Sequence, residues 1–388
     1  MARSPWRRSD SAALLLAVAA LWLPPVRGQD ASAKADVAVS ALPSLKEIYR
    51  DAFQVGVALG GRLPDGLSER ERDVLRREFS TVTPENCLKM GHVARSRGRW
   101  DFAEADQFVE FAEANRLSIV GHCLLWAKDE RTPHWFFRDG EALLGRDALR
   151  ERLRDYISRV VGRYRGKIAA WDVVNEALSD DPKEALRPSS WVSILGEDAI
   201  ADAFTFAHEA DPDALLILND YNIENPAKRE RLLALLGRLK AKNVPIHGVG
   251  IQGHWEIDHV PYAEIKDTIA ALRAMGVKVL ITELDLDMIP RSKWWADGGK
   301  HHAELSKLNP YPKGLPDDLL KLQADRYGEL FRLFKANADV IDRVTFWNLH
   351  DGQSWLNDFP WRRVNHPLLF DRQGKPKPAF WSVAGAGE

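Results

Sequence analysis

The chain lacks the features of a disulfide-stapled, nucleic-acid-binding or membrane-spanning protein. Among 388 residues it has two cysteines, Cys87 and Cys123, so disulfides are not its scaffold. We expect buried free thiols, and a bridge between the two is the alternative. Its net charge of −2 gives no electrostatic reason to bind nucleic acid or an anionic membrane. Beyond the N-terminus no apolar run approaches the roughly 18 residues of a membrane span. We therefore expect a soluble protein that binds neither nucleic acid nor a membrane, and we take a monomer as the expected state.

The N-terminus has the pattern of a secretory signal. Three arginines among the first eight residues precede the apolar run 12–23, which is too short to cross a bilayer as a helix. Three segments are predicted: a signal peptide over 1–28, a leader or linker over 29–41, and a catalytic domain over 42–384. The protein is then secreted, and the signal alone does not distinguish the periplasm from the extracellular space.

Short β-branched runs alternate with amphipathic stretches along the rest of the chain, without internal repeats. The predicted strands are Phe53–Leu59, Ser80–Asn86, Ser118–Leu125, Ala169–Asn175, Leu215–Asp220, Gly248–Gly253, Val277–Leu284 and Val344–Asn348. Most lack polar alternation, which is typical of parallel strands buried on both faces. Predicted helices between them include Arg146–Tyr164, Gly196–Ala210, Lys228–Lys242 and Tyr262–Met275. The pattern predicts an α/β protein with a single closed (β/α)8 TIM barrel. An open doubly wound sheet is the alternative, but no G-x-G-x-x-G follows the first strand.

Polar and reactive residues end almost every predicted strand. They are Glu85-Asn86, His122 to Trp126, Asn175-Glu176, Asn219 to Asn222, Gln252 to His254, Glu283 to Asp285, and Trp347. Barrel enzymes build their sites at this C-terminal rim. A single such ending could be a helix cap, but so many are typical of an active site.

Two of these residues, Glu176 and Glu283, end the fourth and seventh strands. One strand-end glutamate alone is more often the partner of a barrel arginine. Two that face each other roughly 5 Å apart can act as nucleophile and as acid then base in a retaining glycosidase. In a rim that also carries amides, imidazoles and indoles, this pair points to glycoside hydrolysis.

The ordered motifs resemble glycoside hydrolase family 10 over nearly the whole mature chain. They are Pro84-Glu85-Asn86 with Lys89, Gly121-His122 with Trp126, Trp171 to Glu176, Asn219 to Asn222, Gly250 to His254, Thr282 to Asp285, and Trp347 with Asp351 and Ser354-Trp355. The resemblance implies a retaining endo-1,4-β-xylanase that acts on xylan or xylo-oligosaccharides. It implies no metal and no cofactor.

The resemblance also assigns roles to the residues around the bond to be cleaved. Glu176 matches the acid/base and Glu283 the nucleophile. His254 matches a histidine that hydrogen-bonds the nucleophile, and Asp285 the carboxylate that orients its ring. Asn175 matches the residue that contacts the sugar 2-hydroxyl. Zinc ligation by His254 is the rival interpretation, but no His-x-His or His-Glu-x-x-His pattern accompanies it.

Further residues match substrate-binding positions of the family. The glycone subsite is Glu85, Asn86 and Lys89; the groups around the reacting sugar are His122, Trp126 and Gln252; the indole walls are Trp347 and Trp355. Such walls disfavour the hydroxymethyl arm of glucose. Tyr221 has two interpretations, an aglycone contact or a support for the fifth strand.

The chain departs from the family pattern at two places on the rim. Where the family continues Trp-His-Ser-Gln, residues 126–131 read Trp-Ala-Lys-Asp-Glu-Arg, and Asn348 replaces a common glycine. Two alternatives therefore remain open: a β-1,4-glucanase or mixed-specificity hydrolase, and a sugar-binding barrel without catalysis. The long proline-containing segment 307–318 is predicted to shape the cleft.

Overall fold

The computed structural model describes residues 43–61, 65–295 and 299–387. The predicted signal peptide and leader, residues 1–28 and 29–41, lie outside the described residues. The predicted catalytic domain, 42–384, lies almost entirely within them.

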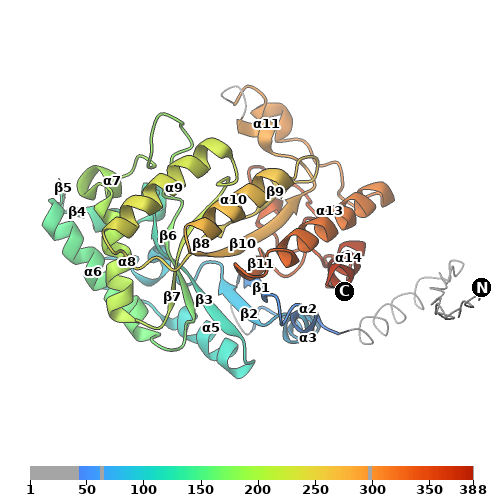
Figure 1. Cartoon of the computed structure of the whole chain (residues 1–388), viewed down its shortest axis with the longest axis horizontal. Helices are drawn as coiled ribbons and strands as arrows, with labels where there is room; N and C mark the ends of the chain where they lie inside the picture. The colour runs from blue at the N-terminus through green and yellow to red at the C-terminus, as the bar shows by residue number, and fades with distance from the viewer. Residues whose placement is uncertain (1–42, 62–64, 296–298, 388) are drawn as a thin grey trace, which may run out of the picture. The chain divides into compact units, whose positions relative to one another are not determined.

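Eight parallel strands of the described chain close into a barrel (Figure 1). They are β1 (Gln54–Leu59), β2 (Thr81–Pro84), β3 (Ser118–Trp126), β6 (Ala170–Asn175), β7 (Leu215–Asp220), β8 (Gly248–Ile251), β10 (Lys278–Asp287) and β11 (Ile341–Phe346). Each pairs with the next, and β11 pairs with both β10 and β1, which leaves no free edge. The predicted TIM barrel is confirmed.

A helix follows each barrel strand and covers its outer side. These helices are α3 (Glu69–Glu78), α5 (Ala103–Ala114), α6 (Arg146–Arg163), α8 (Asp198–Ala210), α9 (Pro226–Ala241), α10 (Tyr262–Ala274), α13 (Asp317–Lys335) and α14 (Pro378–Ala386). Helices α8, α9, α10 and α13 lie side by side along the outside of the strands in Figure 1. Shorter elements decorate the loops: α2 (Leu45–Ile48), α4 (Met90–Val93), β4 (Arg138–Asp139), β5 (Ala142–Leu143), α7 (Ser190–Leu195), β9 (His254–Glu256), α11 (Ser292–Trp295) and α12 (His302–Leu305).

The strand bounds differ from the prediction mainly in the last two barrel strands. The seventh, β10, continues to Asp287 because residues 285–287 pair with β9. The eighth begins at Ile341, three residues before its predicted start, and its first residues include a buried Arg343. A search for apolar runs does not detect a strand segment that contains polar residues. The sequence pattern therefore missed the first three residues of this strand.

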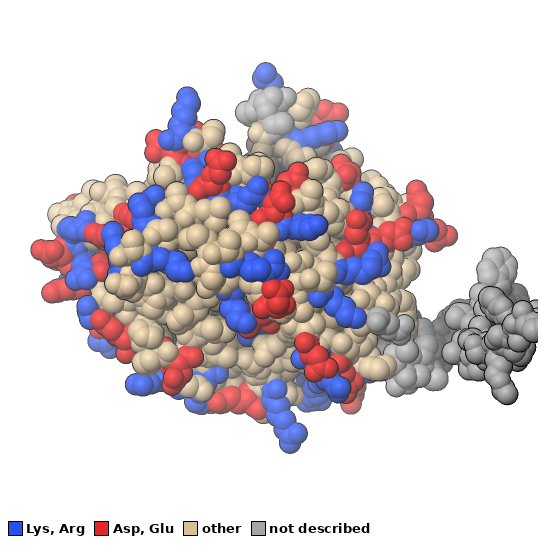
Figure 2. All heavy atoms as spheres, viewed as in Figure 1, with Lys and Arg blue, Asp and Glu red and all other residues tan. Residues whose placement is uncertain are grey.

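The barrel interior is closely packed, and the outer surface mixes charges of both signs. Gly121 of β3 leaves room for the fully buried indole of Trp171 on β6: a Cβ there would lie 2.1 Å from the ring. Figure 2 shows lysine and arginine interspersed with aspartate and glutamate over the visible face. No helix within the described ranges is long and apolar enough to cross a membrane. Cys87 and the buried Cys123 are both free thiols.

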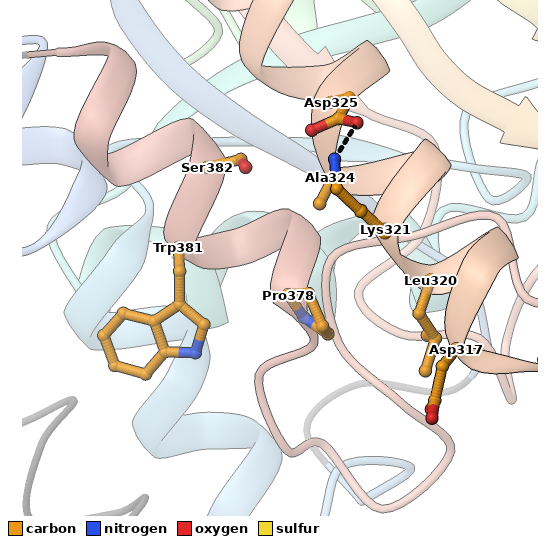
Figure 3. A pocket seen from close by; sticks show the side chains of 8 residues that line it. All are labelled: Asp317, Leu320, Lys321, Ala324, Asp325, Pro378, Trp381 and Ser382. Carbon is orange, nitrogen blue, oxygen red and sulfur yellow. Dashed lines mark hydrogen bonds and ion pairs between the residues drawn. The ribbon is translucent and has the colours of Figure 1, made fainter. Parts of the chain in front are cut away.

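A hollow lies between α13 and α14 (Figure 3). It is lined by Asp317, Leu320, Lys321, Ala324, Asp325, Pro378, Trp381 and Ser382. It shares no residue with the polar strand ends, which lie at the C-terminal rim of the barrel.

Candidate active site

The fourth barrel strand, β6, delivers Asn175 and Glu176 to the rim. Glu176 has a left-handed backbone, φ 57°, which is a strained conformation for a residue with a side chain. Its N–H donates to the Asn219 carbonyl at 2.8 Å, and Arg187 Nε donates to its carbonyl at 3.0 Å. These bonds hold the backbone kink at the end of the strand, where the Glu176 side chain is buried and only 7% exposed.

The seventh barrel strand, β10, places Glu283 in a different environment. Asn219 Nδ2 donates to Glu283 Oε1 at 2.7 Å, and His254 Nε2 lies 3.1 Å from its other oxygen. Burial alone would raise the pKa of Glu283, but the bond from His254, the charges of the nearby imidazoles and the Asn219 amide together lower it. Glu283 is therefore held as a carboxylate.

His254 is fixed from its other side. Its Nδ1 lies 2.9 Å from Asp285 Oδ2, and the same oxygen accepts a bond from Trp355 Nε1 at 2.8 Å. Burial alone would lower the pKa of His254, yet the charge of Asp285 and the bonds to Asp285 and Glu283 raise it to about 9. His254 is therefore a protonated imidazole between two carboxylates. The structure brings His254, Asp285 and Glu283 together, and their roles in the reaction stay predictions.

Two amides link the two glutamates. Gln252 Nε2 lies 3.4 Å from Glu176 Oε1 and 3.3 Å from Asn175 Oδ1. Asn219 Nδ2 continues the path, 2.9 Å from Asn175 Oδ1 and 2.7 Å from Glu283. The structure thus brings both predicted carboxylates and Asn175 into one buried network.

The remaining predicted residues on the inner side of the rim gather around this network. His122 is buried, with Nδ1 2.8 Å from Asp172 Oδ2 and its ring 5.2 Å from the ring of Trp347. The Trp347 and Trp355 rings lie 6.3 and 4.9 Å from His254. Indole surfaces of this kind can stack on sugar rings.

The predicted glycone residues form an adjoining group. Lys89 donates to Asn86 Oδ1 at 3.0 Å, and its ammonium lies 4.9 Å from the centroid of the Trp126 ring. Glu85 accepts a bond from Asn348 Nδ2 at 3.0 Å. Asn348, the residue in place of the common glycine, therefore connects the loop after β11 to the loop after β2.

Tyr221 lies at the edge of the site and is tied to neighbouring loops. Its hydroxyl bonds to Asp180 and accepts from Arg187 Nη2 at 2.7 Å, and the Lys228 ammonium lies 3.9 Å over its ring. These contacts give Tyr221 a supporting position between the loops after β6 and β7.

The residues absent from the predicted site include three that contact its buried members. Asn219 joins Asn175 to Glu283, Asp172 supports His122, and Lys128 Nζ lies 2.5 Å from Glu176 Oε2. Asn219 and Asp172 are polar residues inside buried strands, a signal that the sequence does carry. Lys128 follows a strand end in a charged stretch, where the sequence gives no sign of its partner.

The segment 307–318 packs against the loop after β11. Trp361 Nε1 donates to the Leu308 carbonyl at 2.8 Å, and the Val364 N–H donates to Asn309 Oδ1 at 2.9 Å. The segment therefore braces the loop that carries Trp355. Its influence on the cleft stays a prediction.

A family model, curated relatives and solved structures all match this chain to the same family. The chain matches the model of glycosyl hydrolase family 10 over residues 44–386. It is 40% identical over 346 residues to an endo-1,4-beta-xylanase of Geobacillus stearothermophilus, which covers 89% of this chain and 98% of that protein. A beta-1,4-xylanase of Dictyoglomus thermophilum is 39% identical over 343 residues, covering 88% and 90%. A solved family 10 endoxylanase from a sugarcane soil metagenome superposes with a TM-score of 0.81 at 40% identity, covering 89% of this chain and all of that one.

Proposed function

Because the chain belongs to glycosyl hydrolase family 10, we infer that it is a retaining endo-1,4-β-xylanase, which hydrolyses internal β-1,4-xylosidic bonds of xylan. The single observation within the site that supports this assignment is the environment of Glu283, a buried carboxylate whose two oxygens each contact a side-chain nitrogen. Glu283 is stabilised as an anion by an imidazole and an amide. We assign Glu283 as the nucleophile and Glu176 as the acid/base.

In the first step, a Glu283 oxygen bonds to the anomeric carbon while the bond from that carbon to the glycosidic oxygen breaks. The departing oxygen takes the proton of Glu176. The imidazolium of His254 and the amide of Asn219 hold Glu283 in place for the attack. The product is a glycosyl ester on Glu283.

In the second step, water attacks the anomeric carbon and gives a proton to Glu176, and the ester bond to Glu283 breaks. Glu283 returns to its carboxylate form and Glu176 regains its acid form. Esterification removes the negative charge of Glu283, which makes the loss of the Glu176 proton easier between the two steps. Two inversions at one carbon give net retention.

Substrate-binding roles are proposed for the residues around this pair, and their positions on the rim support them. We propose that Glu85, Asn86 and Lys89 hold the glycone sugar and that Trp347 and Trp355 wall the reacting one. We also propose that Asn175 contacts the 2-hydroxyl of the reacting sugar and that Gln252, which bonds to Asn175 and Glu176, lies beside that sugar. His122 and Trp126 border the same space.

A product analysis tests this function directly. The purified enzyme is incubated with arabinoxylan, glucuronoxylan and carboxymethylcellulose, and the anomeric configuration of the first products is followed by NMR. We expect xylo-oligosaccharides released in the β-configuration and little action on the cellulose derivative. Initial α-products would contradict the retaining mechanism, and faster cellulose cleavage would favour the glucanase alternative.

We also propose that the protein is exported. The support is the basic and apolar pattern of residues 1–28. N-terminal sequencing of the protein recovered from the medium or the periplasm should begin near residue 29. An intact Met1 in the active, cell-associated protein would overturn the proposal.

A further inference from the structure

The loop after β3 places a lysine on the acid/base carboxylate. Lys128 Nζ lies 2.5 Å from Glu176 Oε2, and the two side chains are 24% and 9% exposed. Among the residues that the structure describes, Lys128 is the cation paired with this carboxylate. This lysine stands in the stretch where the chain departs from the Trp-His-Ser-Gln pattern.

The position of Lys128 is held from both sides. Its ammonium lies 5.6 Å from the centroid of the Trp126 ring and 5.7 Å from that of Tyr221, within the range of cation–π attraction. The next residue, Asp129, accepts bonds from the N–H and the hydroxyl of Ser190 at 2.8 and 2.7 Å. The start of α7 therefore anchors the loop, and the Lys128 ammonium is attracted by two aromatic rings.

Other charged groups face Glu176 from the surrounding strands and loops. Glu283 on β10, which accepts a bond from Asn219, and Asp220 on β7 are acidic; burial, and to a smaller extent the charge of Glu176, raises the pKa of Asp220. Arg187 donates to the Glu176 carbonyl and also bonds Tyr221, and His254 on β9 is occupied with Glu283 and Asp285. Lys228 is paired with Asp180 and Asp220. Lys128 is thus the group whose charge acts on the Glu176 carboxylate at contact distance.

We propose that Lys128 is a positioning residue that shifts the balance between the acid and base duties of Glu176, and this rests on the proposed acid/base role. An ammonium at contact distance favours the carboxylate over the carboxylic acid. It helps the second step, in which Glu176 must accept a proton. It opposes the first step, in which Glu176 must carry one. The lysine also keeps Glu176 Oε2 in one place while Gln252 contacts Oε1.

Removing the charge of Lys128 should therefore shift the pH dependence of both steps in the same direction. In Lys128→Met, the carboxylic acid form persists to higher pH. The alkaline limb of the first step and the acid limb of the second step should then both move up, by about one pH unit for an ion pair at this distance. Loss of packing alone would lower the rates without moving either limb.

Two aryl β-xylobiosides separate the steps. The kcat/KM of the phenyl glycoside, a poor leaving group, follows the first step and needs the proton of Glu176. The kcat of the 2,4-dinitrophenyl glycoside follows the second step and needs its carboxylate. Full pH profiles are measured for the wild type, Lys128→Met and Lys128→Gln, with thermal unfolding as the check that each variant is folded.

Matched variants serve as controls. Lys128→Arg keeps the charge and should leave both limbs within a few tenths of a unit of the wild type. Lys183→Met removes one charge from an exposed position on the loop after β6, and it should leave both limbs unchanged. Unmoved limbs in both neutral variants at position 128, or opposite shifts of the two limbs, overturn the proposal.

Different results would contradict the acid/base role of Glu176 and the role of Lys128. If Glu176→Ala affects the two glycosides equally and azide restores nothing, the role of Glu176 is wrong. If that variant behaves as expected but the limbs of Lys128→Met stay in place, the lysine proposal alone is wrong.

Discussion

The amide of Asn219 joins the end of β6 to Glu283 on β10. Its Nδ2 donates to Asn175 and to Glu283, and its Oδ1 accepts from the Thr282 hydroxyl at 2.6 Å. It stands opposite Gly250 in the β7–β8 register, where a Cβ would lie 2.3 Å from Asn219 Oδ1. The glycine therefore makes room for the amide, and the amide holds the Glu283 carboxylate.

Glu176 should be dispensable where no proton is needed. In Glu176→Ala, we expect kcat/KM on xylan and on the phenyl xylobioside to fall about 10²- to 10⁴-fold, the usual contribution of general acid catalysis. The 2,4-dinitrophenyl glycoside should still form the intermediate. Added azide should then accelerate turnover and give a β-glycosyl azide, detected by NMR; an α-azide would contradict two inversions at the anomeric carbon.

His254 should control the pH range over which Glu283 is a nucleophile. Its hydrogen bond is the largest cause that lowers the pKa of Glu283 against burial. In His254→Ala, that pKa rises, so the acid limb of kcat/KM moves to higher pH and the loss of activity grows as pH falls. The pH profile for the 2,4-dinitrophenyl glycoside measures this. A loss of equal size at all pH values would mean that His254 supports the site by packing alone.

At the scale of an element, the loop after β11 depends on one residue with unusual geometry. Asn348 has φ 92°, its Nδ2 holds Glu85, and its Oδ1 accepts from the Trp355 N–H at 3.3 Å. A residue that favours this backbone and carries both a donor and an acceptor connects the glycone group to the indole wall. Asn348, which stands where the resemblance places a glycine, thus links Glu85 to the loop that carries Trp355.

A pair of variants separates backbone from side chain at this position. Asn348→Gly keeps the backbone without strain and loses both bonds, so we expect a several-fold rise in KM for xylotriose with little change in stability. Asn348→Ala loses the same bonds and adds strain of about 1–2 kcal/mol, visible as a lower midpoint of denaturant unfolding. A wild-type KM in the glycine variant would mean that Glu85 is positioned without Asn348.

At the scale of the whole molecule, the barrel interior tolerates no added atoms at Gly121. A Cβ there would lie 2.1 Å from the ring of Trp171, which is fully buried and cannot move aside without disturbing the neighbouring strands. We expect Gly121→Ala to destabilise the fold by about 3 kcal/mol or more, measured by denaturant unfolding.

Gly237 on the exposed side of α9 is the matched control, since a Cβ there meets nothing within 4 Å. Gly237→Ala should stabilise the protein by about 0.5–1 kcal/mol, because alanine loses less backbone entropy in a helix. Equal stabilities of the two alanine variants would show that the interior can relax around position 121.

The sequence by itself determined the barrel and the choice of Glu176 and Glu283 as the candidate carboxylate pair. Parallel strands buried on both faces appear as apolar runs, and reactive residues such as Glu176 and Glu283 end them, so strand order and rim chemistry are both visible along the chain. Only the tertiary structure decided which polar groups meet. The contacts of Asn219 with Glu283, of Lys128 with Glu176 and of Asn348 with Glu85 join different strands and loops. They depend on strand register and barrel closure, which no local pattern contains.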